Sequence, residues 1–134
     1  MSFRLNRRVP LYLSLFATIG FAAVGLWFGF GNLDVARALG RIGDYAPLFV
    51  FVPVAISIEL VGITVSIKVP GNRLGPVFTG IGLAMAAGSA AYFVAVDVFN
   101  SGGTPASGWR ILAITGPLLT FGSMLVLIAS LIAF

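Results

Sequence analysis

The sequence predicts an all-α integral membrane protein, a single domain in which four transmembrane helices form a bundle. The chain has 134 residues, of which 59% are hydrophobic and only 9% are charged, whereas about a quarter of the residues of an ordinary soluble protein are charged. Its mean hydropathy is +1.08. Four apolar segments each reach the ~20 residues that an α-helix needs to cross ~30 Å of hydrocarbon. These segments are residues 11–30, 46–67, 76–99 and 111–134.

The first helix is expected to be a retained membrane anchor. It follows Arg4, Arg7 and Arg8, which resemble the basic start of a signal peptide. Its apolar run is longer than the about 7–15 residues of a signal-peptide core. Its many aromatic side chains suit a surface that faces lipid or a hydrophobic partner.

The second helix follows a polar segment, residues 32–45, which we expect to form either a short helix at the membrane surface or an ordered connector. Pro47 suits the first turn of the second helix, and Pro53 is a candidate for a kink. The second loop, residues 68–75, contains a Pro-Gly pair. Such a short turn joins antiparallel neighbours.

The third helix carries the small residues that allow membrane helices to approach one another closely. They fall on two adjacent rows of the helix. We predict a packing seam formed by Gly80, Ala84, Gly88, Ala87 and Ala91. We interpret this seam as packing within the bundle, in preference to a dimer interface.

The fourth helix follows Trp109 and Arg110, which we expect to anchor it at the membrane interface. Pro117 lies within it and is a second candidate for a kink. Because this helix runs to Phe134, we expect the protein to act within or at the surface of the bilayer, or through another polypeptide.

The basic residues predict the orientation, because Lys and Arg near helix ends stay on the cytoplasmic side. Five of the eight basic residues precede the first helix or lie in the second loop, and three lie on the opposite side. Both termini are therefore expected to be cytoplasmic, in a multi-pass protein of a cell membrane such as the bacterial inner membrane.

The composition excludes several kinds of chemistry. The sequence contains no Cys and no His, which removes thiolates, disulfides, imidazole bases and the usual zinc and haem ligands. We therefore predict no metal site, no cofactor apart from bound lipid, and no enzymatic activity. The sequence contains no basic patch with interleaved aromatic residues, the pattern that would indicate binding to nucleic acid.

Glu59 is the one ionisable residue expected deep in the membrane, about 13 Å from the end of the second helix at ~1.5 Å per residue. A carboxylate at that depth costs several kilocalories per mole unless it is paired or protonated. The residue shares a helix face with Ser66. We predict either proton or cation coupling, or a role in helix packing. For packing, the expected hydrogen-bond partners are Ser89, Tyr92 or Thr115.

Asp97 is expected near the end of the third helix, where it reaches water at the membrane surface. We predict an interfacial role in which Arg110 is its ion-pair partner. A second coupling site is the alternative.

Two stretches resemble known families. The run Ile58–Lys68 resembles the glutamate-bearing helix of small multidrug resistance transporters, which exchange protons for cationic aromatic compounds; this implies a coupling role for Glu59. Residues 68–75, followed by residues 80–83, Tyr92 and Trp109, are similar to the N-terminal four-helix membrane region of bacterial sensor histidine kinases. That resemblance implies a sensor-like or scaffold-like module without catalytic residues.

Two functions follow from these observations. We predict a non-catalytic accessory subunit or sensor-like interaction module of a larger membrane complex, with membrane lipids and other membrane subunits as partners. The alternative is a small proton- or cation-coupled transporter or channel that works as a homodimer through Glu59. Replacing Glu59 by Gln abolishes flux in the second case and leaves assembly intact in the first.

Overall fold

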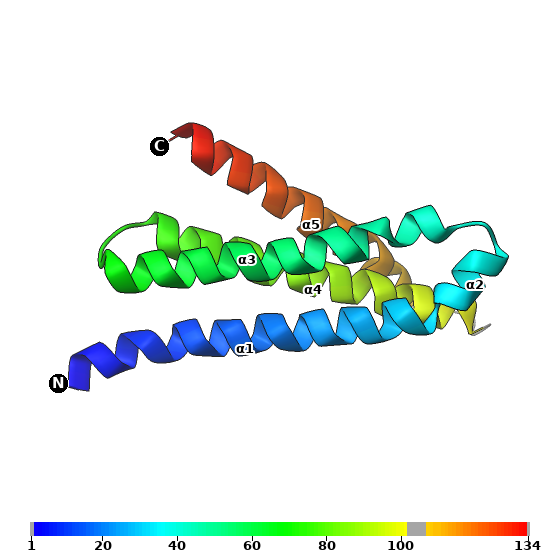
Figure 1. Ribbon diagram of the computed structural model, residues 1–134, viewed down its shortest axis with the longest axis horizontal. Helices are drawn as coiled ribbons and strands as arrows, with labels where there is room; N and C mark the ends of the chain where they lie inside the picture. The colour runs from blue at the N-terminus through cyan, green and yellow to red at the C-terminus, as the bar shows by residue number, and fades with distance from the viewer. Residues whose placement is uncertain (1, 102–106, 134) are drawn as a thin grey trace.

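The computed structural model describes residues 2–101 and 107–133, and within these ranges every regular element is a helix (Figure 1). Four helices are long and apolar enough to cross a membrane, which confirms the predicted class. The elements are α1 (Ser2–Gly31), α2 (Leu33–Ala38), the 3-10 helix η1 (Ile42–Tyr45), α3 (Ala46–Lys68), α4 (Leu74–Asn100) and α5 (Ser107–Ala133).

The main difference from the predicted helices is the start of α1. This helix begins at Ser2 and continues through Pro10, well before the expected residue 11. Hydropathy identifies the part of a helix that lies in hydrocarbon. It does not detect polar turns that extend the same helix into water. The segment expected to be a short helix or a connector, residues 32–45, contains α2 and η1.

The long helices run alternately up and down. Both termini and the α3–α4 turn lie at one end of the molecule, and α2 lies at the other end (Figure 1). At the α3–α4 turn, Gly71 adopts a φ of 98°, a conformation that a glycine reaches without steric cost. The backbone N–H of Leu74 donates to Asn72 Oδ1 at 2.8 Å, and α4 begins at Leu74.

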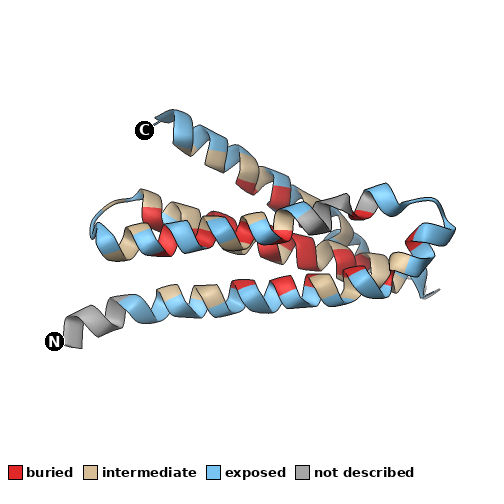
Figure 2. Ribbon diagram, viewed as in Figure 1, coloured by how far each residue is buried: buried red, intermediate tan, exposed pale blue. Residues whose placement is uncertain are grey.

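α4 is the centre of the bundle and packs against α1, α3 and α5. Half of its membrane span is buried, compared with 17% of the spans of α1 and α5. Figure 2 shows the buried residues concentrated where α4 meets its neighbours, while the outer sides of α1 and α5 are exposed. α4 is therefore the element on which the other helices assemble.

α3 and α4 approach so closely that there is no room for a side chain at Gly62 or Gly82. A Cβ atom at Gly62 would lie 2.5 Å from the backbone nitrogen of Thr79. A Cβ atom at Gly82 would lie 2.6 Å from Glu59 Cβ and 2.7 Å from the carbonyl oxygen of Ala55. In lipid, such backbone contact through small residues is what holds two helices together.

α5 makes a similar close contact with α4 at Gly88 and Gly116, and its side chains pack on the bundle as far as Leu127 before the helix diverges. A Cβ atom at Gly88 would lie 2.6 Å from the carbonyl oxygen of Gly116, and one at Gly116 would lie 2.7 Å from that of Gly88. Beyond this crossing α5 leaves the bundle towards its C-terminal end (Figure 1). Leu131 and Ile132 are accordingly exposed.

The packing contacts of α4 run along a different face from the predicted row. Gly88 is buried against α5, but Gly80 is exposed and has no neighbouring atom within 4 Å of a Cβ position. Ala84, Ala87 and Ala91 are half-buried. At 3.6 residues per turn, Gly82 lies about 200° around the helix from both Gly80 and Ala84, so the contact with α3 falls on the side of α4 opposite the predicted row.

The role of close backbone contact can be tested with two glycine substitutions on the same helix. We expect Gly82→Ala to destabilise the protein by about 1–3 kcal/mol, because its methyl group forces α3 and α4 apart. Gly80→Ala, which meets open space, should leave stability unchanged or slightly raised. Thermal unfolding in detergent micelles measures both, and equal stability of the two variants would contradict the packing described.

Candidate functional site

Glu59 is the centre of the candidate site. It lies in α3 and its side chain is fully buried, with 0% of its surface exposed. Ala55, Gly62 and Ile63 on the same helix face are also buried. Ser66 shares this face but lies against Gly75 near the end of α3, about 10 Å along the helix from Glu59.

The partner of Glu59 is Ser14 of α1. The Ser14 hydroxyl donates to Glu59 Oε1 at 2.6 Å, within the range of a strong O–H···O hydrogen bond. This bond joins two helices across 45 positions of sequence. It replaces the predicted partners Ser89, Tyr92 and Thr115.

Two further buried polar atoms, one on Glu59 itself and one on α1, lack a partner. Glu59 Oε2 and Thr18 Oγ1 are both buried and neither forms a hydrogen bond. Thr18 is fully buried and lies one helical turn beyond Ser14 on the same face of α1. Because buried polar groups in proteins are nearly always hydrogen-bonded, the unpaired oxygen atoms of Glu59 and Thr18 call for a chemical explanation.

The predicted partners lie elsewhere. Ser89 and Tyr92 line a cavity of about 350 Å³ between α3, α4 and α5, a volume within the range of small-molecule pockets. Aromatic rings form much of its wall, including Phe51 and Phe121, which meet edge to face at 5.9 Å. Glu59 does not line this cavity. The Thr115 hydroxyl makes only a long contact of 3.5 Å with the carbonyl oxygen of Leu112.

Asp97 belongs to a network of amide side chains. Asn32, buried at the end of α1, donates from Nδ2 to Asp97 Oδ1 at 2.8 Å and to the carbonyl oxygen of Phe28 at 2.9 Å. Asn100 Nδ2 in turn donates to Asn32 Oδ1 at 3.1 Å. The predicted ion pair with Arg110 is wrong, since these two described side chains form no salt bridge and Arg110 is exposed. The side chain of Trp109 lies outside the described residues.

Other charges contribute little to a site. Arg37 and Asp34 form an exposed ion pair at 3.2 Å within α2, and such surface pairs add little stability. Within the residues that the structure describes, no three His, Cys, Asp or Glu side chains gather as metal ligands would. The site is thus one carboxyl group held between helices by the hydroxyl group of Ser14.

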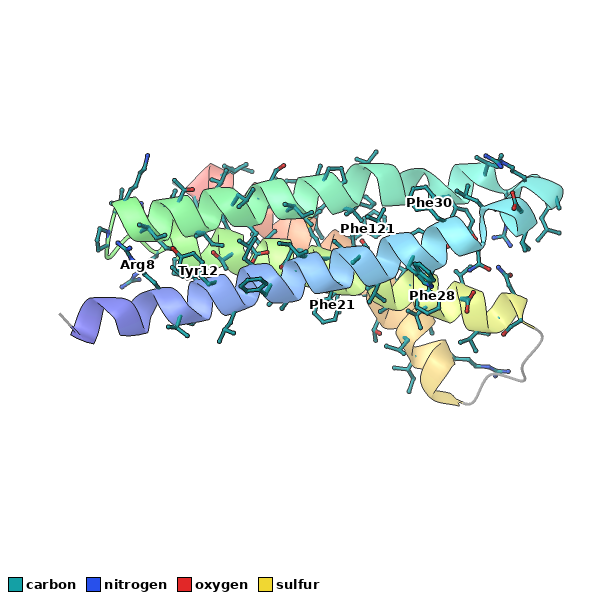
Figure 3. All side chains as sticks on the ribbon, turned by 60° about the horizontal axis from the view of Figure 1, so that its bottom comes forward. Arg8, Tyr12, Phe21, Phe28, Phe30 and Phe121 are labelled. Carbon is teal, nitrogen blue, oxygen red and sulfur yellow. The ribbon has the colours of Figure 1, made fainter. Side chains whose placement is uncertain are left out.

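Sequence reasoning missed Ser14, Thr18, Asn32 and Asn100. A signal for the first two exists in α1, where small and polar residues recur at every third or fourth position: Ser14, Thr18, Ala22, Gly25 and Gly29. All but Ser14 are buried, and Ser14 is half-buried. The bulky residues of α1, such as Arg8, Tyr12 and Phe21, lie off this stripe and are exposed (Figure 3).

The chain matches no protein-family model, and no curated protein and no solved structure is significantly similar to it. The resemblances to small multidrug resistance transporters and to sensor histidine kinases therefore stay predictions. The function has to be argued from the residues of this chain.

The amide network can be tested with a double-mutant cycle. We expect Asn32→Ala to destabilise the protein by about 1–3 kcal/mol, because it leaves Asp97 and Asn100 without their partner. Asn32→Ala and Asp97→Asn should be coupled by about 0.5 kcal/mol or more, as measured by unfolding in detergent. Arg110→Gln serves as the control and should change stability little, and independent effects at Asn32 and Asp97 would argue against the network.

Proposed function

We propose that this protein is a non-catalytic accessory subunit, or interaction module, of a larger membrane complex, and that it binds a membrane-spanning helix of a partner subunit. The distribution of basic residues supports an orientation with both termini in the cytoplasm. In this proposal the binding surface is the uncovered side of α4. We refer to it as the Gly80 face, and it consists of Gly80, Ala84, Ala87 and Ala91.

The Gly80 face is the observation that carries the proposal. Glycines at helix contacts in this chain pack closely on a neighbour, as Gly62, Gly82 and Gly88 do. Gly80 lies in a row of small residues with Ala84 and Ala87. Nothing, however, lies within 4 Å of a Cβ atom placed at Gly80. Small residues at four-residue spacing allow the backbone of another helix to approach.

Lipid alone explains this face less well than a protein helix does. Many exposed residues of the other helices are bulky and apolar, such as Phe16 at 73% exposure, Trp27 at 78% and Ile132 at 81%. Such side chains fill the irregular space among acyl chains. A row of glycine and alanine instead offers a flat surface on which a second helix gains close van der Waals contact.

A second candidate function, proton or cation coupling, is favoured by the unpaired Glu59 Oε2. Intramembrane acids commonly mark pathways for ions or protons. In this chain, however, Glu59 lines neither the cavity between α3, α4 and α5 nor the smaller one between α2 and α4. The accessory role therefore remains our first proposal.

Two matched glycine substitutions test the accessory role. Gly80→Leu and Gly20→Leu both enter open space, on α4 and on α1, so both variants should fold. We expect mild extraction from the native membrane to co-purify partner subunits with the unmodified protein and with Gly20→Leu. The yield of partner should fall at least tenfold with Gly80→Leu, as quantified by mass spectrometry.

Two results would contradict this proposal. One is recovery of the unmodified protein alone or only as a homodimer. The other is retention of all partner subunits by Gly80→Leu, which would move the binding surface away from α4.

A further inference from the structure

We propose that Glu59 is a reversible proton-binding site inside the helix bundle, in which the proton resides on Oε2 and Ser14 and Thr18 are positioning residues. This inference goes beyond the accessory function and does not depend on it. It rests on the burial of Glu59, on its one short hydrogen bond and on the two polar atoms that lack partners.

The absence of a nearby counter-charge favours the neutral form of Glu59. Glu59 is fully buried, and no described basic residue forms a salt bridge with it. On α1 the nearest titratable residues are Arg8 and Tyr12, which are exposed. On α3 the nearest is Lys68 at the end of the helix. Arg73, at the start of α4, is nine residues or about 14 Å from Gly82 and is exposed, and within α4 the nearest is Tyr92, ten residues or about 15 Å from Gly82. The one titratable residue of α5 is Arg110. It lies near the start of α5, at the end of the bundle opposite the C-terminal turns of that helix. A buried carboxylate without a counter-charge is far more costly than a neutral carboxylic acid.

The hydrogen bonds of Glu59 are compatible with its neutral form. Oε1 accepts from the Ser14 hydroxyl, as the carbonyl oxygen of a neutral carboxylic acid does. A protonated Oε2 is a donor and needs an acceptor. Thr18 Oγ1, buried and without a partner one helical turn beyond Ser14, is the acceptor that we propose, reached through a side-chain rotation or one bridging water. Because a hydroxyl group both donates and accepts, Thr18 can pair with Oε2 in either protonation state, and the missing counter-charge is what favours the proton.

The small number of oxygen atoms at this contact favours a proton over a metal cation. Hard cations in proteins take about six or more oxygen ligands. This contact offers the oxygens of three side chains, Ser14, Thr18 and Glu59. The backbone of Gly82 lies so close to Glu59 Cβ that even a methyl group would not fit there. A proton needs one acceptor and no coordination shell.

Release of the proton follows directly from this arrangement. The O–H bond of Oε2 breaks, its electron pair stays on the carboxylate, and the proton passes to water. The resulting anion is buried without a counter-charge, and Ser14 is its hydrogen-bond donor in the structure. A carboxylate accepts this bond more strongly than a neutral acid does, so we infer that the cost of burying the charge is what favours separation of α1 from α3.

Infrared spectroscopy of the full chain in lipid nanodiscs tests this proposal without a mutation. Glu59 is the only Glu in the sequence and Gln is absent, so carboxyl-¹³C glutamate labels this one carboxyl group. We expect a protonated-carboxyl C=O band at neutral pH that shifts to lower frequency with the label. The band should disappear reversibly as the pH is raised and should be insensitive to NaCl at constant pH.

Variants separate positioning from a purely structural role. Thr18→Val and Ser14→Ala should each shift the frequency of the labelled band, because each removes one hydrogen bond to the carboxyl group, while Gly20→Leu on the exposed side of α1 should not. Absence of a label-sensitive C=O band at neutral pH would overturn the proposal. A band that disappears on addition of Na⁺ at constant pH would also overturn it and would assign a cation site instead.

Discussion

The backbone contact between α3 and α4 is the interaction on which the rest of the structure depends. Hydrocarbon gives helices little reason to prefer one another to lipid, so their association requires surfaces that fit without intervening side chains. Gly62, Gly75 and Gly82 provide this surface by leaving no room for a Cβ atom between the helices. The same contact determines where Glu59 lies, because its Cβ packs directly on Gly82. α1 then completes the enclosure of the carboxyl group with Ser14.

The four spans could be predicted from sequence because hydropathy depends on local composition alone. The position of Glu59 along α3 follows for the same reason, since the rise per residue of a helix is constant. Its partner could not, because Ser14 is 45 residues away and their meeting depends on how α1 is rotated about its axis. The stripe of Ser14, Thr18 and Ala22 contains that information, but it is obscured by the more conspicuous aromatic residues of the same helix.

α4 shows why small residues predict that a helix packs closely, but do not predict which side of the helix makes the contact. Glycine and alanine occur on nearly every side of this helix, so the sequence offers several equally plausible seams. The structure places Gly82 against α3 and Gly88 against α5, and it leaves Gly80 uncovered. What selects among these faces is the shape of the partner helices, which single-sequence periodicity does not contain. Asp97 illustrates the same point. Its partner is the buried amide of Asn32, although the charged Arg110 is much nearer to it in sequence.

The attachment of α1 differs in kind from the other helix contacts. Where α1 approaches α4 at Gly25, a Cβ atom would meet Ala90 only at an ordinary distance of 3.4 Å, so the backbones are not locked together as α3 and α4 are. Two polar contacts supplement this packing, one from Ser14 to Glu59 and one from Asn32 to Asp97. The carboxyl group of Glu59 is the fully buried member of these two contacts, so a charge on it would lie inside the bundle at the contact between α1 and α3. On the proposal above, a proton on Glu59 therefore favours the attachment of α1, whereas the contact between α3 and α4 is made largely by backbone atoms at Gly62, Gly75 and Gly82.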